Sequence, residues 1–327
     1  MVKYRSIKEI ARLYGDGNTD GLHHFLKDSP VDPHTLQTIN MIAIARRIKK
    51  PAILILDDTP SPRTGKHIEG IGTHHGADGF VKGQCAVTAS VVSGAERYSW
   101  AIRGYRPKRS CTADQFKSKI ELALDIIDES KEYLGKDVTV AFDAWYTCAP
   151  VLNRIQESGW RFVSAIKCNR VVYVGAHKTR VRHLAKGPRQ YKTVRIVKRE
   201  YRVAKKIVHL PNVGEVAMFI SKCGTDRRYI VTNDLTMTAR QAVKIYCQRT
   251  WIEQFHKEMK ESLGFNEMFM RSWRGVQQHW TLVGIAYNTI ALASRRQSRL
   301  KSFRKRISTF RETVFHDKII HLYKKAG

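Results

Sequence analysis

Two short apolar runs that each stop at an aspartate most constrain how this chain can fold. Ile53–Leu56 is an unbroken aliphatic run before Asp57, and Val138–Phe142 is a second apolar run before Asp143. Runs without polar alternation predict strands that are buried on both faces, as in a sheet covered by helices. We therefore expect a central sheet with helices on both sides, in which both aspartates lie at strand ends.

The segments around these runs predict the order of that sheet. They comprise a hairpin over residues 84–103, a helix over 112–135, a helix over 147–157 and a strand over 162–166. Thr112 and Gln115 have the spacing of a capping box, so we place the start of the first helix there. The resulting order is the chain order of a ribonuclease-H-like mixed α/β sheet. In such a sheet the strands before Asp57 and Asp143 are neighbours.

The charge of the chain indicates its partner. Lys and Arg number 58 against 29 Asp and Glu, which gives a net charge of +29. A surplus of this size favours a polyanion such as nucleic acid, and a ribosomal-type or membrane-surface protein is the alternative on charge alone. No apolar run reaches the ~18–20 residues of a membrane span, so we expect a cytoplasmic protein without a membrane partner. The six cysteines stand singly, which argues against a zinc knuckle or a disulfide framework.

A predicted helix over residues 239–263 carries the most informative side chains. Thr238 and Gln241 form a second capping-box pattern at its start. At helical spacing one face presents a single acid among cations and a phenol, while the opposite face is apolar. The polar face consists of Tyr246, Arg249, Glu253, Lys257 and Lys260. This composition fits a metal-bound carboxylate beside a phosphate backbone, and a solvated basic face is the alternative.

Asp57, Asp143 and Glu253 together form the candidate site. A cluster of carboxylates is the oxygen-rich environment that Mg²⁺ or Mn²⁺ prefers. Two such ions at ~3.5–4 Å from each other can serve in-line displacement at phosphorus. One aspartate at a strand end is weak evidence, but two of them with a carboxylate on a basic helix are much stronger evidence. The sequence therefore predicts a site for two divalent ions.

The spacing on the predicted helix resembles a known signature. Tyr246 is followed after two residues by Arg249, after three more by Glu253, and after six more by Lys260. This resembles the YREK signature of the DDE transposases of prokaryotic insertion sequences, in the group with a β-rich insertion before the glutamate. The segments around Asp57 and Asp143, Ile-Leu-Asp-Asp-Thr and Ala-Phe-Asp-Ala-Trp-Tyr, resemble the aspartate motifs of this family. The likeness extends over residues 51–290.

The resemblance implies a role for each matching residue. Asp57, Asp143 and Glu253 would be the metal-binding triad. Asp58 is the alternative to Asp57, which is preferred because the family commonly places Thr or Ser two residues after the ligand, and Thr59 stands there. The DNA contacts implied or predicted on the helix are Tyr246, Arg249, His256, Lys257 and Lys260. For His256, packing against Phe255 is the alternative, and Trp145 and Tyr146 are predicted to be packing residues.

The domain organisation follows from composition and the resemblance. We divide the chain into a helical N-terminal part (1–50), a core in two parts (51–167 and 238–293), a β-rich insertion (168–237) and a basic tail (294–327). The N-terminal part is a candidate for DNA binding, and the tail is a candidate for dimerisation or DNA contact. The insertion has 16 Lys and Arg against 4 Asp and Glu, and the resemblance implies that it contacts transposon-end DNA.

The aromatic residues of the insertion depart from the family pattern. In better-known members an aromatic there stacks on a flipped base. Here no tryptophan lies between Trp160 and Trp251, and the aromatic candidates are tyrosines such as Tyr173, Tyr191 and Tyr201. A hairpin DNA intermediate is therefore not predicted for this chain.

The function implied is that of a transposase. It would cleave transposon-end DNA, join the 3′-OH to target DNA, and act as a homodimer on double-stranded DNA in the nucleoid. The alternatives are a catalytically inactive or domesticated DNA-binding relative and a ribonuclease-H-like nuclease or resolvase.

Overall fold

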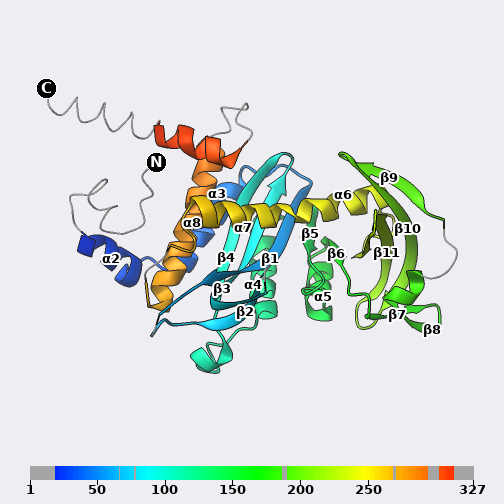
Figure 1. Cartoon of the computed structure of the whole chain (residues 1–327), viewed down its shortest axis with the longest axis horizontal. Coiled ribbons are helices and arrows are strands. Elements are labelled where there is room, and N and C mark those ends of the chain that lie inside the picture. Colours follow the sequence, from blue (N-terminus) through cyan, green and yellow to red (C-terminus); the bar gives the residue numbers. More distant parts are fainter. Residues whose placement is uncertain are drawn as a thin grey trace.

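A single twelve-stranded mixed sheet runs through the computed structural model of the protein (Figure 1). The structure describes residues 19–65, 67–76, 79–185, 190–267, 270–293 and 302–312. Most of the described helices lie against the two faces of the sheet, so the predicted mixed α/β architecture is confirmed.

The first half of the sheet has the strand order β4-β3-β1-β5-β6, and β2 pairs with the first residues of β3, on the same side as β4. Its strands are β1 (Ala52–Pro62), β2 (Gly72–Gly76), β3 (Gly79–Ser93), β4 (Glu96–Tyr105), β5 (Val138–Phe142) and β6 (Arg161–Ala165). The strands β1, β3 and β4 are antiparallel, whereas β1, β5 and β6 are parallel. This order is consistent with a ribonuclease-H-like sheet, in which the strands before Asp57 and Asp143 are adjacent.

The β-rich segment after β6 continues the same sheet. Its strands are β7 (Val171–Val174), β8 (His177–Arg180), β9 (Lys192–Ile196), β10 (Arg199–Leu210), β11 (Gly214–Cys223) and β12 (Asp226–Thr232). The junction is the antiparallel pairing of β12 with β6, where Ile230 lies opposite Ala165 and Val231 lies opposite Ser164. The inserted strands therefore bury the polar edge of β6 and extend the sheet to the right in Figure 1.

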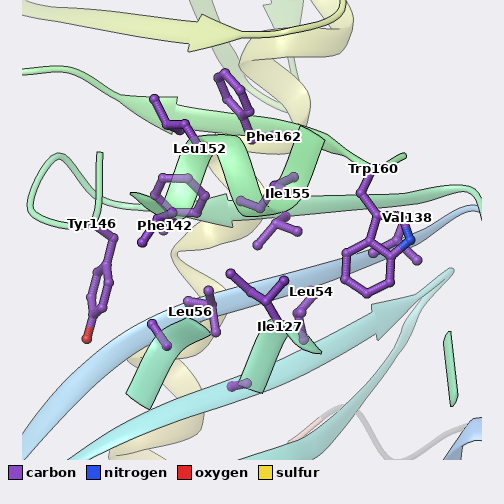
Figure 2. Packing of buried hydrophobic residues seen from close by; sticks show 14 of the residues in the cluster. Leu54, Leu56, Ile127, Val138, Phe142, Tyr146, Leu152, Ile155, Trp160 and Phe162 are labelled. Atoms are coloured by element: carbon purple, nitrogen blue, oxygen red, sulfur yellow. The ribbon is translucent and has the colours of Figure 1, made fainter. Parts of the chain in front are cut away.

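Helices cover the two faces of the sheet in two groups. α4 (Lys119–Leu134) and α5 (Ala149–Glu157) pack on one face, where the residues drawn in Figure 2 form part of the largest core cluster. α6 (Ala239–Arg249), α7 (Trp251–Ser262) and α8 (Trp273–Ala293) pack on the other face. α2 (Thr19–Asp28) and α3 (Pro33–Ala45) contact α8, and residues 303–312 form a further helix. No helix in these described stretches is long and apolar enough to cross a membrane.

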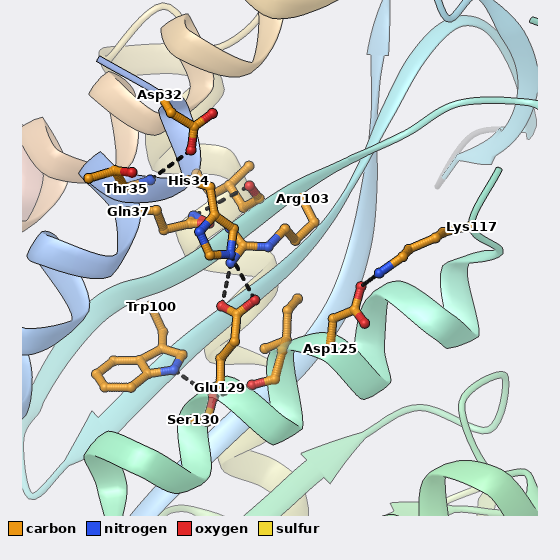
Figure 3. Close-up of polar contacts among 12 residues, drawn as sticks. Asp32, His34, Thr35, Gln37, Trp100, Arg103, Lys117, Asp125, Glu129 and Ser130 are labelled. Carbon is orange, nitrogen blue, oxygen red and sulfur yellow. Dashed lines mark hydrogen bonds and ion pairs between the residues drawn. The ribbon is translucent and has the colours of Figure 1, made fainter. Parts of the chain in front are cut away.

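A polar cluster joins α3 and α4 to the edge strand β4 (Figure 3). The Arg103 guanidinium donates to the Glu129 carboxylate, which also pairs with His34 at 3.0 Å. The Trp100 indole donates to Ser130 Oγ at 2.7 Å, and the Ser130 hydroxyl donates to the backbone of its own helix. Burial lowers the pKa of Arg103 while the adjacent Glu129 opposes that effect. These partners satisfy the polar groups that β4 would otherwise bury alone.

Three predicted boundaries were wrong. β1 does not stop at Asp57 but continues to Pro62 as the partner of β3. The first helix begins at Lys119, because Ser118 and Glu121 form the capping box; the Thr112 carbonyl instead accepts from Gln115 and Phe116 in a separate turn. The predicted 239–263 helix is two helices.

The break between α6 and α7 lies at Thr250. The Thr250 hydroxyl and its N–H both donate to the Cys247 carbonyl, so this side chain competes for an acceptor of the regular helical ladder. The capping box of Thr238 and Gln241 is confirmed at the start of α6. The predictions for residues 1–18 and for most of the 294–327 tail lie outside the described residues.

Candidate metal centre

Strand register brings Asp57 and Asp143 together. β1 and β5 are parallel, and their pairing ends with Ile55 opposite Ala141. Asp57 and Asp143 each stand two residues after this last pair. The two aspartates therefore lie side by side at the point where the pairing of β1 with β5 ends. Adjacent strands are ~4.8 Å apart, which places the two carboxylates close enough to repel each other. The mutual repulsion contributes to the pKa of Asp57 described below.

Strand alternation separates Asp57 from Asp58. Ile55 packs in the core cluster of α7 and α8, while Leu56 packs in the cluster of α4 and α5. Because successive side chains point to opposite faces, Asp57 faces α6 and α7 whereas Asp58 faces α4. The contacts agree: Asp57 Oδ2 lies 3.5 Å from Arg249 Nη1.

Asp58 is engaged on the α4 face. Its Oδ2 accepts from Lys119 Nζ at 2.6 Å, and its Oδ1 accepts from the Tyr146 hydroxyl at 3.3 Å. The Cys85 thiol also lies within 3.5 Å of Oδ2. These partners compensate the charge of Asp58 within the protein, which leaves Asp57 as the aspartate directed to the other acidic residues.

Asp143 is oriented by the loop that it begins. Its Oδ1 accepts from the N–H groups of Trp145 at 2.8 Å and Tyr146 at 3.4 Å. The Thr147 hydroxyl donates to the Ala165 carbonyl at 2.6 Å and fastens the loop to β6. Within the described part of the chain Oδ2 of Asp143 makes no hydrogen bond or ion pair. One carboxylate oxygen is thus fixed by backbone, and the other is open to a cation.

Glu253 enters from α7 and is joined to Asp57 by Arg249. Arg249 Nη2 lies 2.6 Å from Glu253 Oε1, and Nη1 of the same guanidinium faces Asp57. The Glu253 side chain is 56% exposed, whereas that of Arg249 is 11% exposed. Among the residues that the structure describes, no three His, Cys, Asp or Glu side chains stand close enough to ligate one ion. The guanidinium lies between the carboxylates and supplies positive charge there.

The electrostatics of Asp57 fit a cation site. Burial raises the pKa of Asp57 to about 7, and repulsion from Asp143 adds to this effect, while Arg249 opposes it. In the protein alone the ionised form of Asp57 is therefore disfavoured, and a cation bound beside this carboxylate would favour it. Together with the hard carboxylate oxygens, this matches what Mg²⁺ or Mn²⁺ would require.

A cleft of about 1280 Å³ contains the candidate residues. Asp57, Asp143 and Glu253 all line it, and its cations include Lys119, Arg249, Lys257 and Lys260. The three predicted carboxylates and three of the predicted basic residues therefore line one cleft. Lys119 was missed in the sequence, since nothing in its local pattern distinguishes it from other lysines near a helix start.

Tyr246 and His256 have more buried positions than the prediction of DNA contact implies. Tyr246 is 7% exposed and packs in the cluster between α6 and the inserted strands, with the Arg249 guanidinium carbon 5.8 Å from its ring centroid. His256 is 9% exposed at the wall of the cleft. Both side chains therefore contact the protein over most of their surface.

His256 connects α7 to the strand that carries Asp57. The Thr88 hydroxyl donates to the Asp57 carbonyl at 3.1 Å, and its oxygen lies 2.7 Å from His256 Nε2. Burial, with the nearby Lys260 and Arg249, lowers the pKa of His256 to about 3. A neutral imidazole in this position can donate its Nε2–H to Thr88 and hold α7 against β3, the strand that pairs with β1.

Comparison with known proteins identifies the family of this chain. The sequence matches the family described as "Transposase DDE domain" over residues 48–289, which include all three carboxylates. It is also 25% identical over 290 residues to a probable transposase for insertion sequence element IS701 from Microchaete diplosiphon. That similarity covers 84% of this chain and 75% of the relative. Since the family match extends over most of the chain, this protein belongs to the DDE transposase family and is a transposase.

Proposed function

We propose that this transposase cleaves transposon-end DNA and joins the resulting 3′-OH to target DNA, with Asp57, Asp143 and Glu253 as ligands of two divalent ions. The observation that carries the proposal is the convergence of these carboxylates, from two parallel strands and one helix, in a single cation-lined cleft. Two Mg²⁺ or Mn²⁺ ions bound there would activate the attacking oxygen and stabilise the leaving oxygen at phosphorus.

Arg249 connects charge balance to DNA binding. Its guanidinium bridges Asp57 and Glu253 in the protein alone, and its planar fork also suits a phosphate. The Tyr246 ring lies next to this side chain, with its centroid 5.8 Å from the guanidinium carbon. We therefore assign Arg249 to the phosphate at the reacting position and Tyr246 to the placement of Arg249.

The other cations extend the DNA path away from the carboxylates. Lys257 is exposed on α7, and Lys260 and Lys119 line the same cleft. Beyond the cleft, the inserted strands carry most of their charge as Lys and Arg. We assign the cleft to the cleaved strand and the inserted strands to duplex DNA of the transposon end. Joining two ends requires both to be held together, and a homodimer would supply this.

The decisive experiment uses DNA from the ends of the element that encodes this protein. Asp143→Asn and Glu253→Gln should each lower Mg²⁺-dependent cleavage and joining by roughly a thousand-fold or more, because each removes several kcal/mol of metal-dependent stabilisation. Both variants should still bind the end DNA. Glu258→Gln is the matched control, since Glu258 lies on the same helix but accepts from Tyr287 on its other side.

The outcomes separate this proposal from its alternatives. Full activity in Asp143→Asn or Glu253→Gln would contradict the metal assignment. Binding of the ends without any Mg²⁺-dependent cleavage by the unmodified protein would identify an inactive DNA-binding relative. Cleavage of branched or hybrid substrates without joining of a 3′-OH would identify a nuclease or resolvase.

A further inference from the structure

The two aromatic residues after Asp143 have opposite environments. Tyr146 is completely buried beneath the loop, whereas Trp145 is 46% exposed. Packing was predicted for both, and it describes Tyr146 alone. A tryptophan that keeps almost half of its surface in solvent, two residues from a carboxylate of the candidate site, requires another explanation, because large aromatic side chains are usually mostly buried.

Trp145 forms the border between two cavities. On one side it lines the cleft that contains Asp57, Asp143 and Glu253. On the other side it lines a second cavity of about 570 Å³, formed by the β5–α5 loop, the link from β6 to β7 and the turn between β10 and β11. This volume lies within the ~300–1,000 Å³ of ordinary small-ligand pockets. A group that leaves the cleft at Asp143 therefore meets the tryptophan first and the second cavity next.

The second cavity has the chemistry of a nucleotide site. Lys167 and Arg170 line it and are exposed, and neither forms an ion pair with any residue in the described ranges. Asn169 also lines it, and a side-chain amide can donate to and accept from the edge of a base. An aromatic face with adjacent cations is the combination that binds unpaired nucleotides, through stacking and phosphate contact.

The ring of Trp145 is held in place by the candidate site itself. The Asp143 carboxylate accepts from the Trp145 N–H at 2.8 Å, and the ring meets Tyr146 edge to face at a centroid distance of 4.7 Å. Lys119 Nζ lies 5.8 Å from the ring centroid. Because Asp143 fixes the backbone of Trp145, the position of the ring is coupled to the position of a proposed metal ligand.

We propose that Trp145 is a stacking platform for an unpaired base of the nucleotide next to the cleaved phosphate. The base enters the second cavity, and its phosphates lie beside Lys167 and Arg170. The base must be unpaired, since a base within a duplex already stacks on neighbours on both faces. This assignment rests on the proposed function of the cleft, and it places the aromatic contact in the core instead of the inserted strands.

The test is a double-mutant cycle between the ring and the base. Binding of the cleaved transposon end is measured by fluorescence anisotropy in the Glu253→Gln background, so that the DNA is not consumed. Trp145→Ala should weaken binding by roughly 5- to 150-fold, the range for loss of one stacked base. An abasic site is then placed in turn at each nucleotide that flanks the cut. At one position the abasic DNA should bind Glu253→Gln and Glu253→Gln/Trp145→Ala almost equally, because the two changes remove the same contact.

Two variants control for effects on folding and on general binding. Trp145→Phe keeps a stacking ring and should restore most of the affinity. Phe80→Ala removes another exposed aromatic, which is 80% exposed on β3 and lines neither of the two cavities. It should leave both the affinity and the response to the abasic site unchanged.

The outcomes distinguish this inference from the function on which it rests. Additive effects of Trp145→Ala and the abasic site at every position would overturn the stacking role, while Mg²⁺-dependent cleavage by the unmodified protein would still support the function. A changed oligomeric state of Trp145→Ala in solution, together with additive effects, would make Trp145 a protein contact and also overturn it. Loss of cleavage in the unmodified protein would instead contradict the function.

Discussion

The two halves of the sheet share one hydrogen-bonded framework but differ in how their charges are arranged. In the half β4-β3-β1-β5-β6, acids and bases meet: Lys119 pairs with Asp58, and Arg249 bridges Asp57 and Glu253. In the half formed by β7 to β12, acids are scarce, and the ion pair within its described residues is Arg195 with Glu200.

This difference separates two kinds of electrostatic task. Ion pairs that are short and partly buried hold each charged side chain in one position, as a site for small ions requires. Exposed cations without acidic partners create a broad positive surface, which suits a duplex whose charge repeats along its length. The pairing of β12 with β6 joins the two surfaces in one hydrogen-bonded sheet, so DNA bound by one half would lie next to the other.

The largest effect should come from removing the charge of one of the two adjacent aspartates in the first half. Asp57→Asn should abolish Mg²⁺-dependent cleavage, with a loss of roughly a thousand-fold or more, because it removes a proposed ligand. Asp58→Asn should retain cleavage but lower the free energy of unfolding, because it leaves Lys119 without its partner.

Thermal unfolding with and without Mg²⁺ compares Asp57 with Asp58 as metal ligands without measuring catalysis. Mg²⁺ should raise the melting temperature of the unmodified protein and of Asp58→Asn, since an ion that binds only the folded state stabilises it. It should not raise that of Asp57→Asn. If Asp58→Asn loses the response to Mg²⁺ and Asp57→Asn keeps it, Asp58 is the ligand and the assignment must be reversed.

A smaller effect is expected from the cations of the second half and of the adjoining start of α6. Lys192, Lys206 and Arg240 are exposed around a cavity between β9, β10 and the start of α6. Replacing each with Gln should lower the steepness of the log–log salt dependence of duplex binding by about 0.9, as expected for one lost phosphate contact. The rate of Mg²⁺-dependent cleavage at saturating DNA should hardly change.

Lys131→Gln provides the comparison for these three variants. Lys131 is also exposed but lies on α4, on the other face of the first half. A decrease of the salt dependence for Lys131→Gln as large as that for Lys192→Gln would mean that DNA binding is not localised to the inserted strands.

The smallest effect concerns His256, which supports the first half from inside. The pKa of this histidine is about 3 in the folded protein and near 6.5 when unfolded. Between these values the unfolded state binds the additional proton, so the stability that depends on neutral His256 is complete above pH 6.5 and decreases as the pH falls towards 3. His256→Gln removes this titration while keeping a side chain that can bond to Thr88.

Urea unfolding at pH 5 and pH 8 measures this contribution. The unmodified protein should lose more of its free energy of unfolding on acidification than His256→Gln does. Acidic groups and the buried His279 titrate in both proteins, so the difference isolates His256. Equal losses in the two proteins would show that His256 is not held neutral by its position.

Local patterns were sufficient for several features of the site. The apolar runs before Asp57 and Asp143 predicted buried strands, because residues without polar alternation must be buried on both faces, and the chain order predicted that these strands are neighbours. The capping box of Thr238 and Gln241 predicted where the helical segment with Arg249 and Glu253 begins. Element boundaries failed where a second interaction competed, as with the β3 partner that extends β1 and the Thr250 hydroxyl that interrupts the helix.

The sequence by itself determined the donor chemistry of this protein: which carboxylates stand after apolar runs, and which carboxylate lies on a helix among cations. Only the tertiary structure showed that Asp57 faces Arg249 whereas Asp58 pairs with Lys119, and that Trp145 and not Tyr146 is the exposed ring. The physical reason is that strand alternation makes neighbouring side chains point to opposite faces of the sheet, but it does not determine which helix covers each face. That choice depends on packing between residues far apart in the chain, here α4 on one face and α7 on the other.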